Sequence, residues 1–313
     1  MNILLIGGGG FLGLNLARAL AYAGHQVHIA DLNLQSVSML QNIKGFCGSS
    51  PLDIANPKEI LDYISSSQIN CVFNLASNLI PSSSYEAYTR ERTDFSSSIT
   101  TFLDSLAEKE VGYVYFSSGG TVYGSSTKSF VNEADPKNPI SYYGLSKLWH
   151  EELILNTSRT KNLHYIILRP SNPFGPLQNP HKKQGLIAVA VDKMRRNEDI
   201  EIWGDGSVVR DYIWVGDLCH AVVSLLEKGC WNEIYNIGSG VGHSINEVLS
   251  AIQSLLDTQS KIFYSPARIE DVKHIVLDVQ KLRSAIEFHP IDLKRGIELY
   301  IRGLDSIQDH PLS

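Results

Sequence analysis

Tyr143 and Lys147 are the two residues of this chain whose types and spacing are best suited to proton-transfer chemistry. They stand four positions apart in the segment 143–158, whose pattern predicts a helix, so both side chains share one helical face. A cation next to a phenol lowers the phenol pKa and makes it usable near neutral pH. The alternative is an exposed i,i+4 contact on an ordinary helix. The hydroxyl- and glycine-rich segment SSGGTVYG at 117–124, shortly before the pair, favours a catalytic site.

A glycine-rich turn near the N-terminus is suited to binding a phosphate group. Gly7, Gly10 and Gly13 have the spacing G-x-x-G-x-x-G, and they follow the apolar run 3–6 and open the helical pattern 12–23. Glycines permit a tight turn and the close approach of a pyrophosphate, while the start of the following helix offers free N–H groups. A structural turn without a ligand is the alternative.

Asp31 ends the next predicted strand, where an acidic side chain can accept hydrogen bonds from both hydroxyls of an adenosine ribose. A carboxylate at this place would repel a 2′-phosphate, so the sequence favours NAD over NADP. Asp53 and Ile54 could flank an adenine, or Asp53 could be an acid preceding a helix that starts at Pro57.

A second glycine-rich segment, GSGVG at 238–242, also follows a strand-like run. It comes too late in the chain for the first strand–helix turn of a dinucleotide-binding unit. We therefore predict a plain turn, followed by a helix that starts at Ser244 with Glu247 completing a capping box.

The elements that must position these residues alternate in the first half of the chain. Apolar runs of strand length occur at 3–6, 27–30, 71–76, 113–116 and 166–168, and helical patterns at 12–23, 57–65, 84–109 and 143–158. This alternation predicts a parallel sheet with helices on both faces. In the second half, the runs 200–203 and 210–215 flank the sequence GDG at 204–206, which predicts a tight connection between two strands. Further helical patterns cover 187–196 and 218–228.

Composition excludes several classes of function. With 313 residues, 43% of them hydrophobic and 19% charged, the chain can build a core without disulfides or a structural metal. The net charge of −6 argues against nucleic acid or an acidic membrane as the main partner. The four cysteines lack metal-ligand spacing, and the sequence has no apolar run of membrane-spanning length and no signal-peptide leader. We therefore expect reduced thiols, no bound metal and a cytoplasmic location.

Together, the motifs resemble those of the extended short-chain dehydrogenase/reductase family, and within it the NAD-dependent nucleotide-sugar epimerases of the UDP-glucose 4-epimerase type. The resemblance covers nearly the whole chain, in the order GGGGFLG (7–13), NLAS (74–77), FSSGGTVYG (116–124), SYYGLSK (141–147), LRPSNPFGP (168–176) and WGDGSVVRDYIWVGD (203–217). It implies an α/β fold with a Rossmann-type doubly wound parallel sheet and a smaller mixed α/β C-terminal substrate lobe. We place the NAD-binding domain at 1–168 and the substrate lobe mainly at 169–313, with segments returning to the sheet.

The resemblance implies a binding site for NAD. The residues assigned to it are Gly7, Gly10, Phe11, Leu12, Gly13, Asp31, Leu32, Asn33, Asp53, Ile54, Leu75, Ala76, Ser77, Tyr143, Lys147 and Pro170. Within this set, Tyr143 matches the family's acid/base tyrosine and Lys147 the lysine that contacts the nicotinamide ribose.

A nucleotide-sugar substrate, linked to UDP, is also implied by the resemblance. The residues assigned to it are Asn172, Gly185, Leu186, Trp203, Arg210, Arg268 and Asp271. Arginines suit a dianionic diphosphate because they bind phosphate oxygens in pairs. Counting from Asp271, the family position at which a tyrosine restricts the pocket to plain hexoses falls on Ile275. The smaller residue implies room for a 2-acetamido group.

The sequence departs from the family pattern at Gly119, where many members carry a catalytic Ser or Thr. Thr121 is our first choice for the replacement hydroxyl, because it faces the same side as Gly119 on an extended chain. Ser118 is the second choice, since the flexible glycines beside it could swing its side chain toward Tyr143.

The same segment bears on the type of reaction. Family dehydratases place Asp-Glu directly after the catalytic Thr, and the related decarboxylases keep the Glu, whereas this chain has Gly120 and Thr121 there. We therefore expect 4-epimerisation of a UDP-sugar (UDP-Glc/UDP-Gal or UDP-GlcNAc/UDP-GalNAc) through a 4-keto intermediate, in carbohydrate metabolism or polysaccharide biosynthesis. The alternatives are a nucleotide-sugar 4-ketoreductase or dehydratase, and a non-catalytic NAD-binding regulator. The family also implies a homodimer through the helices at 84–109 and 143–158.

Overall fold

The structure is a computed structural model that describes residues 1–181, 185–266 and 272–309, apart from the side chains of 94–97 and 306–309. The chain forms two compact units. Unit 1 consists of Met1–Gly124, Pro136–Arg169 and Cys219–Tyr235. Unit 2 consists of Ser125–Asp135, Pro170–Leu218 and Asn236–Ser313. The chain first passes from unit 1 to a long part of unit 2 after Arg169. The division into domains at 168/169 stays a prediction.

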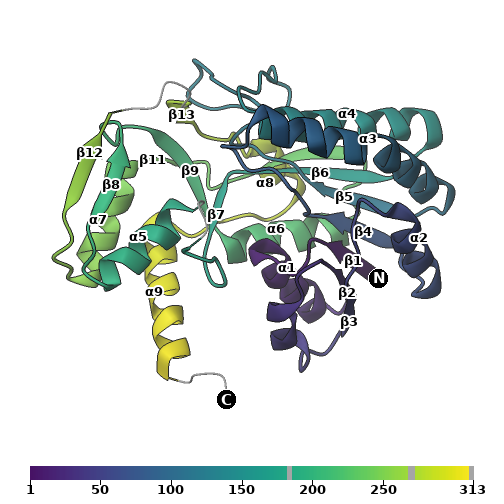
Figure 1. The fold of residues 1–313 in the computed structure, drawn as a ribbon, viewed down its shortest axis with the longest axis horizontal. Coiled ribbons are helices and arrows are strands. Elements are labelled where there is room, and N and C mark those ends of the chain that lie inside the picture. The colour runs from purple at the N-terminus through teal and green to yellow at the C-terminus, as the bar shows by residue number, and fades with distance from the viewer. Residues whose placement is uncertain (182–184, 267–271, 310–313) are drawn as a thin grey trace. The chain divides into compact units, whose positions relative to one another are not determined.

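A seven-stranded sheet forms the centre of unit 1, in the order β10-β6-β5-β4-β1-β2-β3 (Figure 1). Its strands are β1 (Asn2–Ile6), β2 (Gln26–Ala30), β3 (Phe46–Ser50), β4 (Cys71–Asn74), β5 (Gly112–Phe116), β6 (Tyr165–Pro170) and β10 (Glu233–Ile237). All neighbouring pairs from β3 to β6 are parallel. The central strands are continuous apolar runs because both faces of such a sheet are covered. The predicted doubly wound α/β fold is confirmed.

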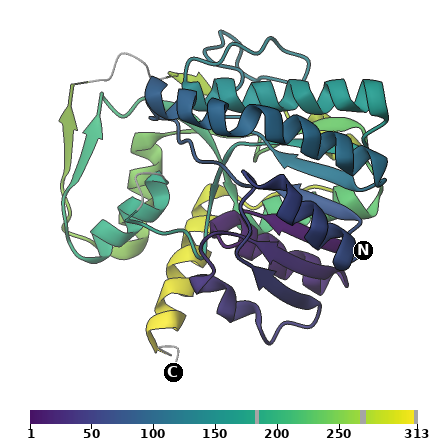
Figure 2. The same ribbon diagram turned by 45° about the vertical axis from the view of Figure 1, so that its right-hand side comes forward.

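Helices of unit 1 complete its core. They are α1 (Phe11–Tyr22), α2 (Pro57–Ser66), α3 (Tyr85–Glu108) and α4 (Tyr142–Lys161), with a 3₁₀ turn at Gln35–Leu40, and α6 (Val215–Glu227) runs on into this unit. α3 and α4 lie side by side in both views (Figures 1 and 2). α4 begins where the Ser141 hydroxyl accepts a hydrogen bond from the Gly144 N–H (3.1 Å), and it ends at Asn162 in the left-handed conformation.

Sheet order places a switch point in the middle of unit 1. β1 continues through α1 to β2 on one side, while β4 follows on the other side of β1. Ligands of doubly wound sheets bind at the carboxyl ends of the strands beside such a point. The turn after β1 and the residues after β4 lie beside this switch point. These are the segments to which the sequence analysis assigned the cofactor.

Unit 2 is built around a mixed sheet centred on β9 (Val209–Trp214). β11 (Gly242–Ser244) pairs with β9 antiparallel, whereas β13 (His274–Ile275) and β7 (Asn172–Phe174) pair with it parallel. A separate two-stranded sheet joins β8 (Ile200–Trp203) to β12 (Ile262–Ser265). The described helices of unit 2 are α5 (Leu186–Arg195), α7 (Ile245–Leu256), α8 (Gln280–Ala285) and α9 (Leu293–Asp309). This is the smaller mixed lobe that we predicted.

One expected connection differs in detail. Residues 204–206 do join two strands, but β8 and β9 belong to different sheets and do not form a hairpin. β8 alternates buried and exposed residues, and its buried Ile200 and Ile202 pack with α5 and α7 residues. No helix within the described ranges is long and apolar enough to cross a membrane.

Candidate active site

The glycine turn after β1 is closely packed. Gly7 has a φ of +77°, and a Cβ at this position would lie 2.7 Å from the Ala76 nitrogen. A Cβ on Gly13 would lie 2.5 Å from the Gly8 Cα. Glycine is thus required at both places. α1 starts after Gly10 without a side-chain cap in the described structure, so its first N–H groups, which include those of Phe11 and Leu12, face no capping side chain.

Asp31 lies directly against this turn. Its Oδ2 accepts a hydrogen bond from the Gly9 N–H (2.8 Å), and its Oδ1 accepts one from the Asn33 N–H (2.9 Å). Each carboxylate oxygen keeps a second lone pair that a ribose hydroxyl could use. The neighbouring Leu32 side chain is 70% exposed. The turn and the acid were predicted from separate motifs, and the fold brings them into contact.

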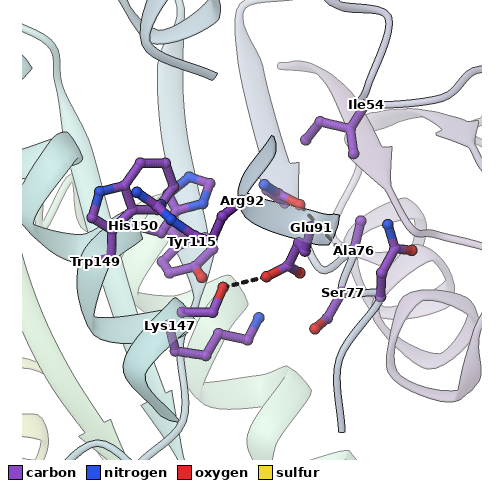
Figure 3. Close-up of a pocket in the computed structure, with 12 residues that line it drawn as sticks. Ile54, Ala76, Ser77, Glu91, Arg92, Tyr115, Lys147, Trp149 and His150 are labelled. Carbon is purple, nitrogen blue, oxygen red and sulfur yellow. Dashed lines mark hydrogen bonds between the residues drawn. The ribbon is translucent and has the colours of Figure 1, made fainter. Parts of the chain in front are cut away.

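The residues after β3 and β4 line a pocket in unit 1 (Figure 3). Ile54, Ala76 and Ser77 belong to its wall, together with Lys147 from α4. Leu75 continues β4, because its N–H donates to the Ile6 carbonyl (2.9 Å). Asp53 accepts from the Ala55 N–H (2.9 Å), which stabilises the turn before α2. This contact fits the alternative that we gave for Asp53.

Tyr143 lies in the first turn of α4 and contacts a serine. Burial raises the pKa of its phenol to about 12, while a hydrogen bond with the Ser118 hydroxyl acts in the opposite direction. The Oγ1 of Thr121 is buried and has no hydrogen-bond partner in the described part of the chain. Ser118, our second choice, is therefore the hydroxyl that touches the phenol. The lowered phenol pKa that we expected is not found, because the cost of burial exceeds the favourable contacts.

Lys147 is buried next to the phenol. Its Nζ lies 5.6 Å from the centre of the Tyr143 ring and donates a hydrogen bond to the Phe116 carbonyl (2.8 Å). Burial lowers the pKa of this amine to about 8, and the carboxylates of Glu91 and Glu151 oppose that shift. Lys147 is thus a cation near neutral pH, but it loses its charge at mildly alkaline pH.

A buried ionic network supports the segment that carries Ser118. Arg169 at the end of β6 forms an ion pair with Glu151 of α4, with Nη2 2.6 Å from Oε2 and both side chains 1% exposed. The Ser117 hydroxyl donates to the same carboxylate, and Arg169 Nη1 donates to the Tyr123 hydroxyl (2.9 Å). Glu151 stands four residues after Lys147, so helical spacing was a signal that sequence reasoning missed.

A second buried network joins β4, β5 and α4. The Asn74 amide donates to the Tyr113 hydroxyl (2.7 Å), which bonds the His150 Nε2 (3.0 Å). Burial first, and then the charges of Lys147 and Arg92, lower the pKa of His150 to about 3, so its ring is neutral. The Asn74 carbonyl oxygen also accepts from the Ala76 N–H (3.0 Å), which fixes the strand end that lines the pocket.

α3 adds two charged residues that the sequence did not indicate. Glu91 accepts a hydrogen bond from the Ser146 hydroxyl (2.6 Å), the residue just before Lys147 (Figure 3). The Arg92 guanidinium stacks on the Trp149 ring, 3.2 Å from its centre. Both line the pocket. No motif marks them, because their place depends on how α3 packs against α4.

Two predicted substrate residues and Ile275 share one face of the unit 2 sheet. Arg210 pairs with Ile275 of β13, and Asn172 of β7 pairs with Tyr212. Because paired residues and alternate residues of a strand point to the same side, the side chains of Asn172, Arg210 and Ile275 lie on one face. Arg210 Nη1 donates to the Val209 carbonyl (2.9 Å).

The other residues assigned to ligands are spread along the chain. Trp203 ends β8, in the separate two-stranded sheet, and is 46% exposed. Gly185, with a φ of +94°, and Leu186 form the start of α5, and Pro170 is the buried last residue of β6. Arg268 and Asp271 lie outside the described residues.

The second glycine-rich turn, at 238–242, surrounds a carboxylate of the chain itself. Asp211 is 1% exposed and accepts hydrogen bonds from the Ser239 N–H and hydroxyl (both 2.8 Å) and from the Gly240 N–H (3.1 Å). The Leu277 N–H adds a longer one (3.3 Å). Burial raises the Asp211 pKa, and these bonds oppose the shift. α7 then starts at the predicted capping box of Ser244 and Glu247.

Comparisons with known proteins agree with this architecture. Residues 3–238 match the profile of the NAD dependent epimerase/dehydratase family. A Methanocaldococcus jannaschii protein, provisionally named a UDP-glucose 4-epimerase, is 33% identical over 95% of this chain and 96% of its own. An Escherichia coli dTDP-4-dehydro-6-deoxyglucose reductase is 28% identical over 97% of both chains. The crystal structure of a Thermotoga maritima UDP-glucose 4-epimerase with UDP-glucose superposes with a TM-score of 0.90 at 29% identity, covering 98% of this chain and 100% of that one.

Among the described residues, no group of three or more His, Cys, Asp or Glu side chains is arranged to hold a metal ion.

Proposed function

We propose, since the chain belongs to the NAD-dependent epimerase/dehydratase family, that it interconverts the C4 epimers of a UDP-sugar. The observation that carries the proposal is the arrangement around the phenol: Tyr143 bonds the Ser118 hydroxyl and lies beside the buried Lys147. A phenol next to a hydroxyl and a cation can both take and return a proton. The relatives named as UDP-glucose 4-epimerases support the same reaction.

The chain fits NAD at the carboxyl end of the unit 1 sheet. A Cβ on Gly7 would collide with the Ala76 backbone after β4, so the turn needs glycine there. The start of α1 carries no side-chain cap in the described structure, and Asp31 faces the same turn. We assign the pyrophosphate to this turn and the adenosine ribose to Asp31. NAD, when bound, accepts a hydride from C4 of the sugar and returns it.

Tyr143 is the acid and base of the proposed reaction. The positive charges of Lys147 and of bound NAD would offset the cost of burial and favour the phenolate. The phenolate takes the proton of the sugar O4 as C4 gives up its hydride, which leaves a 4-keto sugar and a neutral phenol. The phenol then returns the proton to O4 when the hydride comes back to the opposite face. The hydrogen bond from Ser118 stabilises the phenolate, and the Lys147 ammonium adds a positive charge close to it.

We assign the diphosphate and the sugar to unit 2, through Asn172 and Arg210. Ile275 supports the larger 2-acetamido sugars, because it lies opposite Arg210 on the same face and is smaller than a tyrosine.

We also propose a homodimer through α3 and α4. Tyr85 and Tyr142 at the starts of these helices are 58% and 38% exposed and contact each other at 5.6 Å between ring centres.

A 4-ketoreductase is the second candidate. The Escherichia coli relative carries that kind of name and matches over 97% of both chains. A reductase must release its cofactor after each turnover, whereas an epimerase regenerates NAD and can retain it. Asp31, which would repel the 2′-phosphate of NADP, favours the epimerase over an NADPH-dependent reductase.

Chromatography of sugar nucleotides tests the proposal. Purified protein without added cofactor is incubated with UDP-glucose and, separately, with UDP-N-acetylglucosamine. We expect conversion to the C4 epimer, faster for the acetamido sugar, and loss of conversion but retention of NAD in Tyr143→Phe. Failure of both sugars with added NAD, together with oxidation of NADH or NADPH by a 4-keto sugar nucleotide, would replace the epimerase with the reductase.

A further inference from the structure

Glu91 brings a carboxylate from α3 to the pocket that contains Lys147. Its Oε2 accepts a hydrogen bond from the Ser146 hydroxyl (2.6 Å), and Ser146 is adjacent to Lys147 in α4. Glu91 and Lys147 both line the pocket, as Figure 3 shows. The serine therefore fixes the position of a negative charge on the wall that the buried amine also faces.

Several charged and titratable groups surround the tyrosine–lysine pair. α3 contributes Glu91 and Arg92, α4 contributes His150 and Glu151, β5 contributes Tyr113 and Tyr115, and β6 contributes Arg169. The charge of Glu151 is shared with Arg169 in a bidentate ion pair. His150 is neutral, and the Arg92 guanidinium stacks on Trp149. Glu91 accepts its hydrogen bond from the neutral Ser146 hydroxyl, and its negative charge also acts on the neighbouring Arg92 guanidinium.

We propose that Glu91 is a positioning residue that sets the protonation states of the tyrosine–lysine pair and so the pH range in which the enzyme works. This inference rests on the proposed function. The negative charge of Glu91 stabilises the Lys147 ammonium and disfavours the Tyr143 phenolate. Charge interactions of Glu91 with both groups act in these two directions.

The two effects give Glu91 a distinct signature. Loss of its charge makes Lys147 easier to deprotonate, because the ammonium loses a partner. It also makes Tyr143 easier to deprotonate, because the phenolate loses a repelling neighbour. Both apparent pKa values of the pair fall, so both limbs of a bell-shaped pH profile move to lower pH. A residue with only a structural role would lower the maximum and leave the limbs in place.

The experiment compares the pH dependence of kcat/KM in the wild type, Glu91→Gln and Glu91→Asp. We expect both limbs of Glu91→Gln to move to lower pH by about one pH unit, and those of Glu91→Asp to move less because the charge is kept. Glu152→Gln is the matched control, since this exposed residue of α4 also loses one negative charge. Its limbs are expected at wild-type positions.

The outcomes separate this inference from the proposed function. If the wild type epimerises a UDP-sugar and the limbs of Glu91→Gln stay in place, the role of Glu91 is refuted and the epimerase stands. If the wild type turns over no sugar nucleotide, the proposed function fails. The pH dependence of NAD affinity then decides the inference, because Glu91→Gln must lose NAD at lower pH than the wild type does. Equal NAD profiles, or no NAD binding by either protein, would overturn it.

Discussion

Two glycine-rich turns of this chain follow strands and precede helices, but their donors are used differently. The turn at 7–13 leads into α1, which starts without a side-chain cap in the described structure. The turn at 238–242 points two of its N–H groups at the buried Asp211, and the helix after it starts with a complete capping box. Under the proposed function, the first turn keeps donors for a ligand, whereas the second already holds an anion that belongs to the protein.

This difference shows what a glycine pattern can and cannot indicate. Both segments supply the backbone freedom that an anion-binding turn needs. Whether a ligand can bind is decided by side chains from distant parts of the chain. Asp211 of β9 accepts hydrogen bonds from two N–H groups of one turn. Asp31, the residue after β2, accepts only the Gly9 N–H of the other turn among the described contacts. Four substitutions test this contrast, in order of decreasing expected effect.

Asp211→Ala has the largest expected effect. It leaves two close N–H groups and a hydroxyl inside unit 2 without their acceptor, so we expect a loss on the order of 4 kcal/mol in the free energy of unfolding. Urea denaturation measures it, and Asp211→Asn, which keeps one acceptor oxygen, is expected to lose less. A wild-type midpoint in Asp211→Ala would show that the carboxylate does not stabilise this turn.

Gly13→Ala tests the open turn. The added Cβ would lie 2.5 Å from the Gly8 Cα, so the turn must shift and we expect NAD affinity to fall by roughly 100-fold, about 2.7 kcal/mol. Calorimetric titration with NAD measures the change. Gly303→Ala in α9 is the matched control, because a Cβ there meets no atom within 4 Å. Unchanged NAD affinity in Gly13→Ala would separate this turn from the cofactor.

Asp31→Asn sharpens the same test. It removes the charge that faces the ribose but keeps an oxygen for the backbone, and we expect about tenfold weaker NAD binding with less discrimination against NADP. The ratio of the two dissociation constants is the measurement, with the exposed Asp62→Asn of α2 as the control. An unchanged ratio would argue that Asp31 only supports the turn.

Ser239→Ala has the smallest expected effect. It removes the hydroxyl that donates to Asp211 and leaves the backbone N–H in place, so we expect a loss of about 1 kcal/mol in stability and no change in NAD affinity. Urea denaturation and NAD titration on the same sample measure both quantities. A larger effect on NAD than on stability would contradict the division of roles between the two turns.

Sequence patterns predicted the elements that are long and strongly apolar. The strands at 3–6 and 113–116 and the helices near 84–109 and 143–158 lie close to the predicted positions. β3 was missed because its sequence, FCGSS, contains a glycine and alternates partly and fully exposed residues. β13 has only two residues, too few for any pattern. Short and edge strands form because they pair with neighbouring strands, and a local sequence pattern carries no information about that pairing.

The residues of the candidate site also fall into those that one segment predicts and those whose positions depend on tertiary packing. Tyr143 and Lys147 were predicted from helical spacing within one element. The preference for Thr121 assumed an extended chain, but the N–H groups of Thr121 and Val122 both bond the Ser118 carbonyl, so the chain turns there. The alternation of side chains is lost in a turn. The position of Glu91 depends on packing between two helices, which no single segment encodes.

The ion pair of Arg169 and Glu151 restricts the loop that carries Ser118. Through Ser117 at one end and Tyr123 at the other, this pair ties both ends of a short loop to α4 and β6. A loop closed over so few residues has few conformations left to lose. Under the proposed function, the loss of conformational entropy on ordering Ser118 would then add little to the activation free energy of the reaction. The hydroxyl beside Tyr143 would be in place before a sugar arrives.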